Sequence, residues 1–179
     1  PAASTFWRYV DNLGINQAKS LLKVMSILRE RAWQLCDLHY AQIRINIDTT
    51  VKTVYGNQQG ARKGHNPKHP GKEGLRPILC FIEETREYLL GKLRKGASVT
   101  GKEAADFIAA IRAQLPGCVQ YVLLRADGEF LCSQSVKASI EAGFKFIIAN
   151  RGCTPIFDPD KWYRPFKRQA IEYNSCFYQ

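Results

Sequence analysis

The chain has 179 residues, of which 45% are hydrophobic, and its 26 Lys and Arg against 16 Asp and Glu give a formal net charge of +10. This apolar fraction excludes a wholly disordered chain, and the length suits a single domain of ordinary size. No apolar run approaches the roughly 18 residues of a membrane helix, so we expect no membrane partner. The excess of positive charge predicts a polyanionic partner, with nucleic acid first.

The cysteines indicate the redox compartment of the protein, and the two ends of the chain indicate whether it is a fragment. Six cysteines are scattered along the sequence without a CxxC pair. This favours reduced, packed thiols in a cytoplasmic protein over a disulfide framework. The chain begins at Pro1 without an initiator Met and ends at Gln179 without a charged tail. We therefore expect a fragment of a longer protein.

The first 40 residues predict two helices that form a helical lead-in, with a break at Gly14. In the second helix, apolar residues recur at helical spacing and predict a packing face: Leu21, Leu22, Met25, Leu28, Ala32 and Leu35. Basic residues take the other faces: Lys19, Lys23, Arg29 and Arg31. For these a solvated surface is favoured over a DNA-contacting one.

After residue 40 the spacing of apolar residues changes from that of a helix to that of a strand. Residues 43–48 alternate strictly between apolar and polar, which predicts a half-buried strand with Asp48 on its polar face. Thr49 to Tyr55 is rich in Val and Thr and predicts a continuation of this strand. Gly56 to Arg76 is rich in Gly, Pro and basic residues and has no hydrophobic period. It predicts a long loop, and loops of this length are usually functional or mobile.

The remaining chain predicts two strands, a helix, a strand, a helix and a strand, over residues 77–83, 88–93, 100–115, 119–126, 134–142 and 144–149 in this order. The first two strands would form an antiparallel ribbon. The stretch 119–126 is almost continuously apolar, which is typical of a central strand covered on both faces.

This order of elements predicts an α/β fold with a ribonuclease H-like mixed sheet. Three antiparallel-type strands precede alternating helices and strands, and helices would cover both faces of the sheet. Several other α/β folds could share this order. We expect a helical lead-in over 1–40, a catalytic core over 41–152, and the start of a truncated insertion or C-terminal region over 153–179.

Two acidic residues stand out by their placement. Asp48 lies on the first strand, and Asp127 directly follows the buried strand 119–126. Sites in α/β sheets gather at the carboxyl ends of strands, and a pair of carboxylates there suits Mg²⁺ or Mn²⁺. Two such ions about 3.5–4 Å apart can activate an attacking hydroxyl and stabilise a leaving oxygen. From the spacing alone, a turn or cap role for each Asp is favoured over a catalytic one.

Basic residues near the two acids predict contacts to a nucleic-acid backbone. The candidates for DNA binding are Lys52, Arg62, Lys63, His65, Lys68, Lys72 and Arg125. Lys and Arg neutralise phosphates, and the loop glycines allow a close approach of the backbone. The alternatives are a solvated, flexible loop and, for Arg125, an ion pair within the fold.

Two ordered sets of residues form longer motifs. The first comprises Asp48, Tyr55-Gly56, Gly64-His65-Asn66-Pro67-Lys68, Pro70-Gly71 and Pro77. The second comprises Arg125, Asp127 and Phe130. Together they resemble the catalytic core of DDE-type transposases of bacterial insertion sequences, and the resemblance covers about residues 43–152.

The resemblance implies a ribonuclease H-like fold and a transposase. Such enzymes cut DNA at transposon ends with water and join the freed 3′ hydroxyl to target DNA, using Mg²⁺ held by two Asp and one Glu. By position, Asp48 would be the first acid and Asp127 the second, and both would be catalytic metal ligands. The third acid would lie on a helix after an inserted β region, which we expect beyond Gln179.

The resemblance also implies partners and a location. These are double-stranded DNA as transposon ends and target, a homodimer in the full-length protein, and the bacterial cytoplasm near the nucleoid. A fragment that lacks the third acid would be incomplete as an enzyme. Two alternatives stay open: a metal-dependent ribonuclease H-like nuclease or resolvase, and a DNA-binding module without catalysis.

Overall fold

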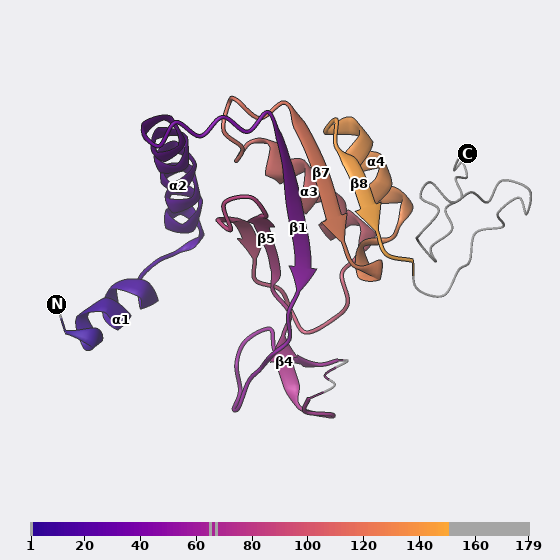
Figure 1. Cartoon of the computed structure of the whole chain (residues 1–179). Helices are drawn as coiled ribbons and strands as arrows, with labels where there is room; N and C mark the ends of the chain where they lie inside the picture. Colours follow the sequence, from indigo (N-terminus) through magenta and orange to yellow (C-terminus); the bar gives the residue numbers. More distant parts are fainter. Residues whose placement is uncertain (1, 65, 67, 151–179) are drawn as a thin grey trace, which may run out of the picture. The chain divides into compact units, whose positions relative to one another are not determined.

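The computed structural model describes residues 2–64, 66 and 68–150 (Figure 1). His65 and the expected C-terminal region over 153–179 lie outside these residues. The helices are α1 (Ala3–Asp11), α2 (Ile15–Leu35), α3 (Gly101–Arg112) and α4 (Ser133–Glu141), with a short 3₁₀ turn, η1 (Gly128–Phe130). The strands are β1 (Gln42–Thr49), β2 (Lys52–Thr53), β3 (Arg62–Lys63), β4 (Glu73–Leu75), β5 (Ile78–Ile82), β6 (Tyr88–Lys92), β7 (Tyr121–Ala126) and β8 (Lys145–Ile148). None of the described helices is long and apolar enough to cross a membrane.

The large sheet has the strand order β6-β5-β1-β7-β8. β5 pairs antiparallel with both β1 and β6, whereas β7 is parallel to β1 and β8 is parallel to β7. Antiparallel strands early in the chain and parallel strands later give the mixed sheet that the element order predicts. The α/β, ribonuclease H-like fold is therefore confirmed.

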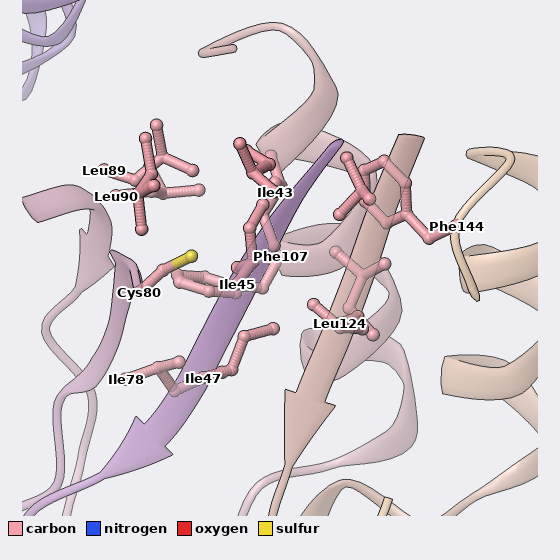
Figure 2. Close-up of a cluster of buried hydrophobic side chains, with 14 of the residues drawn as sticks. Ile43, Ile45, Ile47, Ile78, Cys80, Leu89, Leu90, Phe107, Leu124 and Phe144 are labelled. Atoms are coloured by element: carbon pink, nitrogen blue, oxygen red, sulfur yellow. The ribbon is translucent and has the colours of Figure 1, made fainter. Parts of the chain in front are cut away.

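Strict alternation along β1 decides which of its side chains enter the core. Ile43, Ile45 and Ile47 are buried. They belong to one cluster with Phe107 of α3 and Leu124 of β7, which Figure 2 shows around the central strands. Full burial of such a side chain is worth about 1.5–3 kcal/mol, so the three isoleucines fix the face of β1 that packs against α3.

Helices α3 and α4 lie on the same side of the large sheet (Figure 1). Their inward residues join the core cluster: Ala104, Phe107, Ile108 and Ile111 from α3, and Ala138 from α4. Tyr121 of β7 and Ile147 of β8, on the opposite face by alternation, are 61% and 60% exposed. In the described part of the chain no helix buries these two side chains, and a second covering layer stays a prediction.

Helix α2 packs only in part through the face that its apolar spacing predicts, since Leu22 of that face lies against the core cluster. Leu21, Leu28 and Leu35 are more than half exposed, so the expected packing face is wrong at these positions. Trp33 is buried instead, and its ring meets that of Tyr40 edge-on with the centroids 5.5 Å apart. Trp33, near the end of α2, therefore lies on the side of the helix that faces the core.

Arg29 of α2, expected on a solvated face, is buried. Its guanidinium donates hydrogen bonds to the carbonyl oxygens of Gln114 at 3.0 Å and Tyr88 at 2.8 Å. Its Nε also lies 3.4 Å from the carboxylate of Glu87. Burial lowers the pKa of Arg29, and the charge of Glu87 opposes that shift. Helical spacing could not reveal these contacts, because the partners lie far away in the sequence.

The segment after β1 forms a second, small sheet, so the predicted continuation of the strand and the predicted irregular loop are wrong in part. β4 is its middle strand, with Lys52 of β2 opposite Leu75 and Arg62 of β3 opposite Gly74. The backbones approach so closely that a Cβ on Gly96 would clash with the carbonyl oxygen of Gly74. Because backbone contacts rather than an apolar face hold this sheet, it leaves no hydrophobic period in the sequence.

Cysteines in the described residues are free thiols: Cys36, Cys80, Cys118 and Cys132. Cys80 on β5 is fully buried in the core, and burial raises its pKa to about 12. This thiol therefore stays protonated near neutral pH and acts as a small apolar core residue.

The N-terminus of α3, a helix predicted to start near residue 100, is capped by Thr100. The Thr100 hydroxyl accepts a hydrogen bond from the backbone N–H of Glu103 at 3.3 Å. The Glu103 carboxylate in turn accepts one at 2.7 Å from Arg94, whose side chain is only 3% exposed. The hydrogen bond from Arg94 lowers the pKa of Glu103 to about 2. The cap thus joins the loop after β6 to α3.

We expect Glu103→Gln to lower the free energy of unfolding by about 1–2 kcal/mol at pH 7. The pKa shift alone corresponds to about 3 kcal/mol, and solvent screening of this partly exposed carboxylate reduces it. Because the folded-state pKa lies below the ordinary value of 4.5, the stabilisation is present above pH 4.5 and is lost as the pH falls toward 2. Urea unfolding at pH 7 and pH 3 measures this, with the exposed Glu141→Gln as control. A difference that is equally large at pH 3 would contradict the assignment.

Candidate active site

Asp48 and Asp127 lie at the same edge of the large sheet, although 79 positions (127 minus 48) separate them in the sequence. In the parallel pair of β1 and β7, Ile47 stands opposite Ala126, so the two acids are the next residues along each strand. Ile47 is buried in the core, and alternation turns Asp48 to the other face. Asp127 keeps an extended backbone at φ −79° and ψ 174°, which continues the alternation of β7. The fold thus brings the two acids to neighbouring strand ends.

Each of the two carboxylates forms a local hydrogen bond with the backbone. Asp48 Oδ1 accepts from the N–H of Thr49 at 2.8 Å, and Asp127 Oδ1 accepts from the N–H of Glu129 at 3.1 Å. In the described part of the chain, neither carboxylate forms an ion pair with Lys or Arg. Neighbouring carboxylates without a basic partner repel each other, and a cation between them removes that repulsion.

The donor set of this edge fits a hard divalent cation. Mg²⁺ and Mn²⁺ prefer carboxylate oxygens and keep water or phosphate oxygens as further ligands. Asp48 is exposed and Asp127 is half-buried, so solvent reaches both. Among residues 2–64, 66 and 68–150, no group of three or more His, Cys, Asp or Glu side chains could hold a metal ion. An ion at this edge would therefore have two described protein ligands.

Glu129, two residues after Asp127, also lies at this edge of the sheet. It is not among the candidate site residues that the sequence predicts. Its carboxylate lies 2.8 Å from the guanidinium of Arg76, and it is only 12% exposed. It also accepts hydrogen bonds from the hydroxyl of Thr49 and the N–H of Val99, both at 2.8 Å. An acid in the turn after Asp127 was the available signal. Its partners were not visible, because they lie between 30 and 80 positions away.

Arg125 takes part in an ion pair within the fold, one of the two roles that its position allowed. Its Nη1 lies 3.9 Å from the carboxylate of Glu83, which also accepts a hydrogen bond from Asn46. The side chains of Arg125 and Glu83 are 48% and 39% exposed, so this long pair is worth about 0–1 kcal/mol. A phosphate could displace so weak a partner, and the DNA-binding role of Arg125 stays a prediction.

The small sheet and the segment between β3 and β4 carry most of the other candidate DNA-binding residues. The described ones are all exposed: Lys52, Arg62, Lys63, Lys68 and Lys72. His65 lies outside the described residues. An open groove of about 370 Å³ is lined in part by Tyr55, Lys63, Lys72 and Glu73. Two ammonium groups beside an exposed aromatic ring suit contact with a nucleic-acid strand.

Solved transposase structures match this chain at low identity. The synaptic complex of piggyBac transposase with hairpin DNA matches with 14% identity and a TM-score of 0.48, over 63% of this chain and 24% of that chain. The Mos1 mariner paired-end complex with Mg matches with 11% identity and a TM-score of 0.40, over 75% of this chain and 42% of that chain. The catalytic domain of Mos1 mariner transposase matches with 11% identity and a TM-score of 0.36, over 84% of this chain and 66% of that chain. This chain therefore spans less than two thirds of each of these transposase chains.

One protein family matches most of the sequence. No curated protein matches the chain. The sequence profile of the family described as Transposase DDE domain group 1 matches residues 1–156, which include both acids and the whole small sheet. This match confirms the resemblance to DDE transposases. Because it extends over far more than half of the 179 residues, the chain belongs to the DDE transposase domain family.

Proposed function

We propose that this chain is the part of a DDE transposase that binds divalent metal through Asp48 and Asp127. The observation that carries the proposal is the parallel register of β1 and β7, which ends both strands in an acid at the same edge of the sheet. The absence of a basic partner for either carboxylate among the described residues supports it. The third acid expected of the family stays a prediction.

The reaction that we propose is Mg²⁺-dependent DNA cleavage followed by strand transfer. In cleavage, water attacks the scissile phosphorus and the 3′ oxygen leaves. In transfer, the freed 3′ hydroxyl attacks a phosphorus of target DNA, and the 3′ oxygen of the target strand leaves. A bound divalent ion supplies Lewis-acid stabilisation of the attacking and leaving oxygens. Asp48 and Asp127 would hold that ion, and the basic small sheet would hold the DNA backbone.

Binding of Mn²⁺ by this chain tests the proposal without DNA. We expect the wild-type chain to reduce the electron paramagnetic resonance signal of free Mn²⁺, and we expect Mg²⁺ to restore that signal by competition. A free Mn²⁺ signal that millimolar protein leaves unchanged would overturn the metal-site assignment.

The products formed on DNA distinguish a transposase from a nuclease with the same two acids. The full-length protein, a labelled duplex with a transposon end, a plasmid target and Mg²⁺ form the assay. Joined products are expected of a transposase. Cleavage without joining would favour the nuclease, and binding without cleavage would favour the non-catalytic module.

We expect DNA binding to depend steeply on salt and to lose part of that dependence when the small sheet loses charge. The double variant Lys63→Ala/Lys72→Ala removes two exposed ammonium groups from the groove. If each contacts one phosphate, the slope of log K against log salt should become shallower by about 2. Fluorescence anisotropy with a duplex between 50 and 200 mM salt, concentrations at which such slopes are large, measures this.

A matched control for this experiment lies on the helices. The double variant Lys102→Ala/Lys137→Ala also removes two exposed lysines, each paired with an acid one turn along α3 or α4. It should leave the salt slope unchanged. Equal slopes for the two double variants would remove the small sheet from the DNA-binding surface.

A further inference from the structure

Glu129 joins four separate segments at the edge of the sheet where the two acids lie. It accepts hydrogen bonds from Thr49 at the end of β1 and from Val99 in the loop before α3. It forms an ion pair with Arg76, which connects β4 to β5. Its own N–H donates to Asp127 Oδ1. No other described carboxylate accepts bonds from as many different elements.

The contacts of Glu129 bear directly on the geometry of the two acids. Thr49 is the neighbour of Asp48, and its hydroxyl is bound to the carboxylate of Glu129 at 2.8 Å. Asp127 is bound to the backbone of the same glutamate at 3.1 Å. Two hydrogen bonds through Glu129 therefore connect the hydroxyl of Thr49, the neighbour of Asp48, with the side chain of Asp127. Loss of the Glu129 carboxylate would release the end of β1 from the turn after β7.

The burial of Glu129 makes these contacts strong. Its side chain is 12% exposed and that of Arg76 is 16% exposed, with 2.8 Å between the charged groups. Charge-assisted hydrogen bonds in such surroundings are roughly twice as strong as neutral ones. Arg76 follows β4 directly, so the same ion pair also ties the basic small sheet to the acidic edge.

We propose that Glu129 is a positioning residue that fixes the distance between the Asp48 and Asp127 carboxylates. The proposal rests on the proposed function, since it concerns the metal affinity of that pair. Glu129 would not touch the ion. Its carboxylate would act on Asp48 through Thr49 and would hold the DNA-binding sheet in register with the site through Arg76, while its backbone N–H would hold Asp127.

The test compares Glu129→Gln with Glu84→Gln by Mn²⁺ titration at a temperature where both variants are folded. Glu84 is a matched control, because its carboxylate is 16% exposed and accepts from the N–H and side chain of Arg44 near the start of β1. Loss of an outer-shell partner typically weakens metal binding about 10–100-fold, so we expect about 10-fold weaker binding for Glu129→Gln. Glu84→Gln should change the affinity by less than about twofold, although it should also lower the melting temperature.

A second variant covers the case in which Glu129→Gln does not fold. Thr49→Val removes a single hydroxyl and keeps the volume of the side chain, and we expect it to weaken Mn²⁺ binding by a factor of about 2–5, as the loss of one hydrogen bond does. If the folded variants bind Mn²⁺ like the wild type, Glu129 has only a structural role and the proposal is overturned. If the wild type itself binds no Mn²⁺, the metal-site assignment fails first and the positioning role fails with it.

Discussion

Asp48→Asn and Asp127→Asn should each remove Mn²⁺ binding almost completely. Each variant takes one of two charged ligands from the edge formed by β1 and β7. The loss should exceed the roughly 10–100-fold that the removal of an outer-shell partner costs, because here a direct ligand is lost. Titration of Mn²⁺ against each variant measures the affinity, and a strand-transfer assay with the same substitutions tests the proposed activity.

The controls for the two Asp variants separate metal binding from folding. Asp48 is exposed, so Asp48→Asn should change the metal-free stability by no more than about 0.5 kcal/mol. Asp106→Asn removes an exposed carboxylate from α3, where it pairs with Lys102, and it should leave Mn²⁺ binding unchanged. If Asp48→Asn binds Mn²⁺ as tightly as Asp106→Asn does, the two-carboxylate site does not exist.

Phe130→Ala should be among the most destabilising single substitutions in the described chain. Phe130 ends η1, the turn that begins at Asp127, and its side chain is fully buried. Truncation of a buried Phe to Ala costs about 3–5 kcal/mol, since it removes apolar contacts and leaves a cavity. Urea unfolding followed by circular dichroism measures this loss. Because the same turn carries Asp127 and Glu129, we also expect the folded molecules of this variant to bind Mn²⁺ more weakly than the wild type does.

Two further variants serve as controls for the stability loss expected of Phe130→Ala. Phe130→Leu keeps most of the volume, and its cost should stay below about 1.5 kcal/mol. Phe6→Ala removes an aromatic ring that is 64% exposed on α1, and its cost should stay within about 0.5 kcal/mol. A cost below 1 kcal/mol for Phe130→Ala would mean that the ring does not anchor the turn.

The large sheet was predictable because its pattern is local. The isoleucines of β1 alternate with polar residues, and a strand period of two needs only neighbouring residues to be recognised. The same holds for α3, whose buried residues Phe107, Ile108 and Ile111 recur at helical spacing. The two acids could be selected because each stands at the end of such a pattern. Their mutual position followed from the fold that the element order predicts.

The features that escaped prediction depend on contacts between distant residues. The small sheet is set by three backbones that meet at Gly74 and Gly96, and glycines without an apolar period predict a loop. Arg29 has a basic side chain on a helix, and only its distant carbonyl partners make its burial favourable. Glu129 likewise depends on partners from three other segments.

The parallel pairing of β1 with β7 has a consequence for the order of events during synthesis. β1 can pair with β5 soon after both have been translated, but its other edge has no partner until residue 126 is made. At about 5–20 residues per second, the 79 residues from Asp48 to Asp127 take roughly 4–16 s. During that interval one edge of a strand with three buried isoleucines is open to wrong pairing. The acidic edge thus forms late, and a nascent chain carries no complete pair of carboxylates until the centre of its sheet has closed.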